Sequence, residues 1–194
     1  MRLPYTPVRV SAPAEPPVTL EEAKLYCRVD GGDEDLMIAG LVQAVTDHLD
    51  GYAGVLHRCL VTQTWSITFD RFACGLRLPL PAASIVTVEY LDDDGEWQAV
   101  ADTVWTLRHD ALGSFVELKR DQAWPSISVE PAAVKITFTS GYGAPAAVPD
   151  SIKTAIKMTV AQIYDRRGPG ADAEGIVMSV AAQFFLRPHA LKRL

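Results

Sequence analysis

Residues 61–69 read Val-Thr-Gln-Thr-Trp-Ser-Ile-Thr-Phe, and they mark the point at which the periodicity of the chain changes. Threonine and serine alternate here with larger side chains, and the apolar positions that share one face are Val61, Trp65, Ile67 and Phe69. Alternation with a period of two is typical of an antiparallel strand that buries one face. A sheet is therefore expected to begin at this stretch.

Upstream of this stretch, apolar residues recur at steps of three and four, which is the spacing of helices. Thr19 and Glu22 are spaced as a capping box, so a short first helix is expected to begin after Thr19 and to end near Gly31-Gly32. A second helix is expected from Asp33 onward, because acidic residues favour a helix N-terminus and the apolar spacing continues to Leu56. The two helices form a predicted helical hairpin.

Downstream, short alternating runs predict more strands, and Asp94-Gly95 predicts a hairpin turn just before Trp97. The predicted strands cover residues 76–80, 85–91, 104–108, 115–118 and 134–139. Together with residues 61–69 they predict a central antiparallel β-sheet of about five to six strands. Helix then returns after Pro149, which favours a first helical turn, and ends at Gly168-Pro169-Gly170.

The expected fold class is therefore α+β, with an N-terminal helical hairpin, the sheet, a long C-terminal helix, a shorter helix at roughly residues 174–186 and a docking tail. Residues 1–17 contain five prolines, so they are expected to form an extended arm that is either disordered or laid along a neighbour. The expected divisions are this arm, a main domain at 18–170, and the C-terminal helix with its tail at 171–194.

Composition and charge exclude several classes of function. The 194 residues, with a mass of 21.1 kDa, form one sizeable domain or two small ones, and no apolar run is long enough to cross a membrane. Residues 1–150 hold 11 Lys/Arg against 21 Asp/Glu, whereas residues 151–194 hold 7 against 3. An acidic body disfavours binding to nucleic acid, and a basic end attracts copies of the chain or an acidic partner.

No pattern of catalytic, cofactor-binding or metal-ligating residues stands out, so an enzyme is not expected. His48 and His57 point to opposite sides of a helix, and no histidine has the spacing of a zinc site. Residues 92–96 (DDDGE) fail as a calcium loop and read as a polar hairpin tip, while residues 141–143 (GYG) do not open a helix that would bind phosphate. Cys27, Cys59 and Cys74 carry no signature of a nucleophile.

The C-terminal tail is the strongest candidate for an interaction site. Its apolar and basic residues lie on a segment too short to form a core of its own, and such residues are common anchors at interfaces. We expect this segment to be loose in the free monomer and to become ordered when it docks. The candidate residues are Phe184, Phe185, Leu186, Arg187, His189, Leu191, Lys192, Arg193 and Leu194.

The chain resembles the head–tail connector family of tailed phages, also called head-completion or adaptor proteins, to which adaptors of gene transfer agents are related. The resemblance rests on the order of several short motifs over residues 18–190. They include residues 18–24 (VTLEEAK), 69–72 (FDRF), 78–81 (LPLP), 86–90 (VTVEY), 124–125 (WP), 141–143 (GYG), 164–167 (YDRR) and 180–189 (VAAQFFLRPH). The tail departs from the family pattern at Phe184-Phe185, at His189 and in its last four residues.

The resemblance implies a structural protein of the virion or gene transfer agent particle, located at the head–tail junction and assembled in the bacterial cytoplasm. It implies a ring, usually of twelve copies, beneath the portal protein, with the tail inserted among portal subunits and a stopper or head-completion protein on the tail side. DNA would pass through the ring without sequence-specific binding, which suits an acidic protein. The sequence leaves open two alternatives, a small hydrolase of a phage-like gene cluster and a DNA-binding module.

Overall fold

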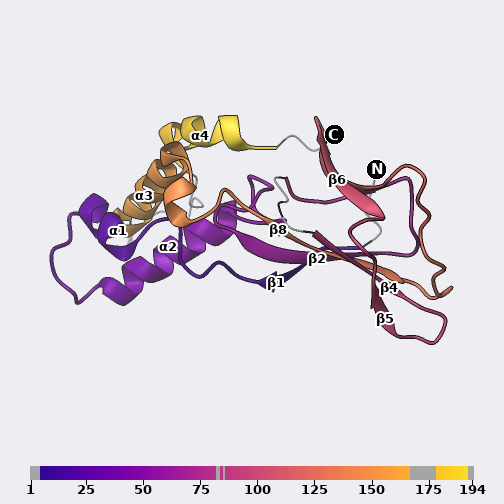
Figure 1. The fold of residues 1–194 in the computed structure, drawn as a ribbon. Coiled ribbons are helices and arrows are strands. Elements are labelled where there is room, and N and C mark those ends of the chain that lie inside the picture. The colour runs from indigo at the N-terminus through magenta and orange to yellow at the C-terminus, as the bar shows by residue number, and fades with distance from the viewer. Residues whose placement is uncertain (1–4, 82–83, 85, 167–177, 192–194) are drawn as a thin grey trace. The chain divides into compact units, whose positions relative to one another are not determined.

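The computed structural model describes residues 5–81, 84, 86–166 and 178–191. The chain divides into two compact units, each built from segments that are distant in sequence (Figure 1). The sheet unit contains Met1–Pro13 and Thr62–Gly141, and the helical unit contains Ala14–Val61 and Tyr142–Leu194. The boundaries of these units do not coincide with the divisions after residues 17 and 170 that composition suggested, because the first strand belongs with the sheets and the last helix with the other helices.

The helical unit opens with α1, Leu20–Cys27, which begins as the capping box predicts. The Thr19 hydroxyl accepts a hydrogen bond from the Glu22 backbone N–H at 3.2 Å, and the Glu22 carboxylate accepts one from the Thr19 N–H at 2.9 Å. Two donors at the helix start, which have no partner within the helix, are thereby satisfied. The helix ends at Arg28, whose φ of 57° places it in the left-handed conformation.

The second helix, α2, covers Asp35–Leu49, and the prediction that it continues to Leu56 is wrong. Asp50 ends it, because the Asp50 carboxylate accepts a hydrogen bond from the Leu60 N–H at 2.7 Å. Gly51 then turns the chain with a φ of 79°. Leu56 is nevertheless buried, because this turn folds it back onto the end of the helix, where its N–H donates to the Leu49 carbonyl. A residue can therefore satisfy a helical apolar pattern without being helical.

Helix α3, Asp150–Asp165, starts directly after Pro149 as predicted and contacts each of the other three helices. The short η1 turn, Pro145–Ala147, precedes it. The last elements are α4, Val180–Leu186, and the η2 turn, Arg187–His189. Residues 167–177 lie outside the described part of the chain. The weaker helix was expected at roughly 174–186, so its first four residues fall in this gap.

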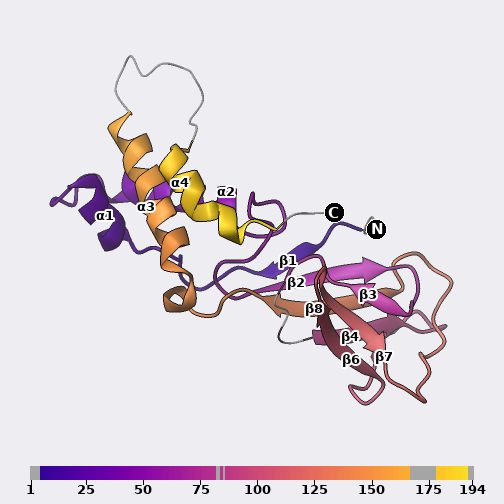
Figure 2. The same ribbon diagram turned by 90° about the horizontal axis from the view of Figure 1, so that it is seen from above.

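The described residues of the sheet unit form eight strands, so the predicted antiparallel sheet is confirmed, but a second sheet accompanies the five-stranded one. The five-stranded sheet has the order β1-β2-β8-β4-β5, and the three-stranded sheet has the order β3-β7-β6. In both views the smaller sheet lies over the larger one (Figures 1 and 2). The strands are β1 Val8–Ser11, β2 Gln63–Phe69, β3 Gly75–Arg77, β4 Val86–Leu91, β5 Trp97–Ala99, β6 Trp105–Asp110, β7 Gly113–Leu118 and β8 Val134–Ser140.

The alternation that first predicted a sheet is confirmed in β2, which pairs antiparallel with β8. Every second residue of each strand is buried, and opposite residues such as Trp65 and Phe138, or Ile67 and Ile136, share the same face. Register is strictly fixed in such a pair, because a slip of one residue would turn every buried side chain to the other face. This face forms the core of the sheet unit.

Within the proline-rich arm, residues 8–11 are extended, as predicted, and form the edge strand β1 against β2. Tyr5 is attached to the same sheet unit, because its hydroxyl donates to the Asp70 carboxylate at 2.6 Å. The expectation that the arm is either disordered or laid along a neighbour is therefore wrong for residues 5–11, which lie along their own chain. An edge strand tolerates nearby prolines, since one side of it needs no ladder hydrogen bonds.

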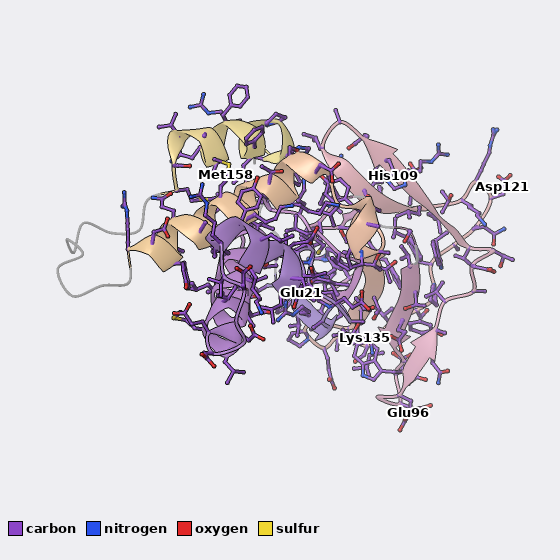
Figure 3. All side chains as sticks on the ribbon, turned by 90° about the vertical axis from the view of Figure 1, so that its left-hand side faces the viewer. Glu21, Glu96, His109, Asp121, Lys135 and Met158 are labelled. Atoms are coloured by element: carbon purple, nitrogen blue, oxygen red, sulfur yellow. The ribbon has the colours of Figure 1, made fainter. Side chains whose placement is uncertain are left out.

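The acidic run at residues 92–96 is a hairpin tip between β4 and β5, as expected. The Asp92 carboxylate accepts hydrogen bonds from the Asp94 and Glu96 N–H groups, and Gly95 turns the chain with a φ of 82°. These bonds hold the pKa of Asp92 below its usual value, with the Glu96 N–H as the largest cause. The Glu96 side chain projects outward at this tip (Figure 3).

Two glycines of the helical unit are expected to respond to alanine in opposite ways. A Cβ at Gly54 would lie within 3.0 Å of backbone atoms of Leu49 and Asp50, whereas a Cβ at Gly40, on the exposed side of α2, would meet no atom within 4 Å. We expect Gly54→Ala to lower the free energy of unfolding by about 2 kcal/mol. Gly40→Ala should raise it by about 1 kcal/mol. Urea unfolding measures both, and a shift of the same sign in both variants would contradict the described turn after α2.

Candidate interaction surfaces

The predicted C-terminal segment begins as a short helix with a defined cap. The Ser179 hydroxyl accepts a hydrogen bond from the Ala182 N–H at 3.2 Å, which starts α4. Helix α4 packs against α3. A helix of seven residues has little stability of its own in water. Its order therefore depends on the contacts that it makes with the rest of the helical unit.

Two of the candidate residues face inward rather than outward. Leu186 is 6% exposed and belongs, with the fully buried Ala182, to the apolar core of the helical unit. Phe185 packs against the same core. The expectation that the apolar tail residues have no partner in the free chain is therefore wrong for Leu186 and Phe185, because both pack with the helical core.

The outward side of α4 carries the exposed candidates. Val180 is 84% exposed and Phe184 is 69% exposed, and Arg187 is also exposed. Their spacing of four and three residues places them in one line along the helix. We call Val180, Phe184 and Arg187 the α4 stripe. A large aromatic side chain held in the open on an ordered helix is a common anchor at protein interfaces.

His189 is half-buried in a polar cluster at the end of the segment. Its Nε2 lies 2.8 Å from the Ser151 hydroxyl on α3, and its Nδ1 lies 3.4 Å from the Tyr142 hydroxyl. Arg58 donates from Nη1 to the same Tyr142 hydroxyl, and its guanidinium carbon lies 5.4 Å from the centre of the Tyr142 ring. Burial, and then the positive charge of Arg58, lower the pKa of His189 below its ordinary value.

The segment has one further attachment, because the Leu191 N–H donates to the Leu56 carbonyl at 3.3 Å. Lys192, Arg193 and Leu194, the last three candidates, lie outside the described residues. Sequence reasoning missed Arg58, Tyr142 and Ser151, because they come from three segments that only the fold brings to His189.

Exposed apolar side chains also lie on α1 and α2, at positions that were not singled out from the sequence. Leu25 is 78% exposed, Leu36 is 92% exposed, and Tyr26 and Met37 are partly exposed. Residues 19–37 hold six acidic and two basic residues, so this stretch of the chain has a negative balance. We call Leu25, Tyr26, Leu36 and Met37 the hairpin patch. Large apolar side chains left exposed to this degree are candidates for contact with another molecule.

The part of the chain that the structure describes contains no group of three or more His, Cys, Asp or Glu side chains that could hold a metal ion. Among the same residues, no helix is long and apolar enough to span a membrane. Cys27 and Cys59 are buried, and Cys74 is exposed.

The fold of this chain occurs in solved structures of gene transfer agent (GTA) particles. A chain in the neck of an empty GTA particle, computed with C6 symmetry, matches with a TM-score of 0.77 and 20% sequence identity. Chains in the virion of a native GTA particle and in the neck of a native GTA particle, computed with C12 symmetry, match with TM-scores of 0.74 at 21% and 19% identity. Each match covers 98% of this chain and 97% of the other. No protein-family model and no curated protein matches the sequence.

Leu186 and Phe184 are expected to differ sharply in their contribution to stability. Leu186→Ala leaves a cavity in the helical core and should lower the free energy of unfolding by about 3 kcal/mol. Phe184→Ala removes an exposed ring and should change it by less than about 0.5 kcal/mol. Urea unfolding followed by circular dichroism compares the two variants. Equal costs would mean that α4 does not pack with Leu186 inward.

Proposed function

We propose that this protein is a structural head–tail adaptor of a tailed phage or of a gene transfer agent particle. The observation that carries the proposal is the structural likeness to chains of GTA neck and virion structures. The likeness extends over nearly the whole of this chain and nearly the whole of each of those chains. The family resemblance of the motifs over residues 18–190 supports the same role independently. In this role the protein acts by binding other proteins, and no residue of it carries out chemistry.

The adaptor forms a ring beneath the portal, of twelve copies as the family resemblance implies. The similar chains come from necks computed with C6 and C12 symmetry, which supports an arrangement of several copies around an axis. A closed ring needs two different, complementary surfaces on each copy. The acidic surroundings of the hairpin patch and the basic balance of residues 151–194 supply such a pair of opposite charge. Charge complementarity of this kind favours encounter in one orientation.

The C-terminal segment joins the ring to the portal. Because Leu186 and Phe185 are committed to the helical core, the α4 stripe and the chain end supply the contact with the portal. The tail-side surface then receives a stopper or head-completion protein, and DNA passes through the ring. The acidic excess of residues 1–150 suits such a passage, because a channel lined by acidic groups does not retain phosphate.

Portal binding is tested with Phe184→Asp in the full chain. We expect this variant to stay folded, because Phe184 is 69% exposed, and to lose co-purification with the portal protein of the same particle. Leu112→Asp is the matched control, since Leu112 is 60% exposed on the turn between β6 and β7, in the sheet unit. A Phe184→Asp variant that retains portal binding at the level of the control would refute the role of the α4 stripe.

Ring assembly is tested with Leu36→Glu. Leu36 is 92% exposed, so the isolated subunit should keep its melting temperature, whereas a carboxylate in a contact between copies is costly. We expect electron microscopy of particles to show necks without the ring. The control is Ala44→Glu, which adds the same charge at an exposed position further along α2. Normal rings in both variants would exclude the hairpin patch from the contact between copies.

A further inference from the structure

The polar cluster around His189 links an arginine, a tyrosine, a histidine and a serine through hydrogen bonds. An arginine side chain can only donate, so the Tyr142 oxygen accepts from Arg58. The Tyr142 hydroxyl proton is then available to His189 Nδ1, which accepts it in the tautomer that carries its proton on Nε2. In that tautomer Nε2 donates to the Ser151 hydroxyl oxygen. This chain of donors, from Arg58 through Tyr142 and His189 to Ser151, runs through a neutral imidazole.

The cluster holds the chain just beyond the helix whose outward side we assign to portal binding. Helix α4 stays in place through Ala182 and Leu186, which are buried. Beyond Leu186, the described attachments are the two His189 bonds and the bond from the Leu191 N–H to the Leu56 carbonyl. Residues 188–191 can therefore come away from the helical unit while the α4 stripe keeps its position.

We propose that His189 is a latch that fastens residues 188–191 to Tyr142 and Ser151 of the same chain, and that opening this latch frees these residues to bind a second protein. The inference rests on the proposed function for the identity of that protein, the portal. The latch itself is a property of the free chain. It makes portal binding a two-step event, in which the α4 stripe makes contact first and the chain end follows.

Acidic pH opens the latch. Protonated His189 cannot accept the Tyr142 proton, so Tyr142 must turn its hydroxyl and accept a second cationic donor beside Arg58, and the two positive charges repel each other. The other groups that face it, Tyr142 and Ser151, are uncharged, and Asp150 on α3 is 95% exposed and paired with Lys153 at 3.0 Å. Because the latched state lowers the pKa of His189, latching is strongest above the ordinary pKa of 6.5 and weakens as the pH falls through it.

The test is residue-resolved hydrogen exchange of the full free chain, with the Leu191 amide as the reporter of latching. We expect Tyr142→Phe and Ser151→Ala each to speed exchange at Leu191 about tenfold, the effect of losing one hydrogen bond of ordinary strength. Amides in the middle of α3 should be unchanged. His48→Gln, a change at an exposed histidine on α2, is the matched control and should leave Leu191 unchanged. Unchanged exchange at Leu191 in both cluster variants would overturn the latch.

A second measurement uses the unaltered protein and so does not depend on how well the variants fold. After correction for intrinsic rates, protection of the Leu191 amide should fall between about pH 7.5 and about pH 5.5, and this fall should be absent in His189→Phe. Protection that does not change with pH in the unaltered protein would overturn the proposal. Neither measurement contains the portal, so loss of the latch and loss of the adaptor function are separate results.

Discussion

Burial of one face of α3 is the constraint on which the helical unit depends. Ile152, Ala155, Ile156 and Val160 are fully buried, and they recur at the spacing that keeps one side of the helix against its neighbours. Two hydroxyls lie in the buried face, and both have partners: Thr159 donates to the Ala155 carbonyl at 2.8 Å, and Tyr164 donates to the Glu34 carboxylate. Helices α1, α2 and α4 all contact α3. Each would otherwise expose an apolar side that it cannot bury alone.

The same constraint decides what the C-terminal segment can offer to a partner. Ala182 and Leu186 belong to the helical core, and this fixes the rotation of α4 about its axis. Val180 and Phe184 are consequently held outward, where the Phe184 ring meets Phe185 edge to face with 5.8 Å between the ring centres. A side chain presented on an ordered element loses less conformational entropy on binding than one on a disordered tail. The segment is therefore better described as a preorganised anchor with a latched end than as a tail that becomes ordered only on docking.

Fold likeness at 19–21% sequence identity means that the fold is shared although most residues differ. Apolar cores tolerate exchange among side chains of similar volume. The Arg58, Tyr142, Ser151 and His189 cluster is more exacting, because each of its hydrogen bonds depends on the donor or acceptor that the side chain supplies.

Local signals in the sequence determined most of the individual elements. The capping box at Thr19 and Glu22, the alternation in β2 and the Asp94-Gly95 turn each involve residues a few positions apart, so the sequence alone predicted them. It also singled out residues 184–194 as a candidate site. The tertiary structure alone decided the end of α2 at Leu49, the separation into two sheets, and which tail residues face inward. These depend on contacts between distant residues, such as Asp50 with Leu60 and Ser151 with His189, and periodicity carries no information about such partners.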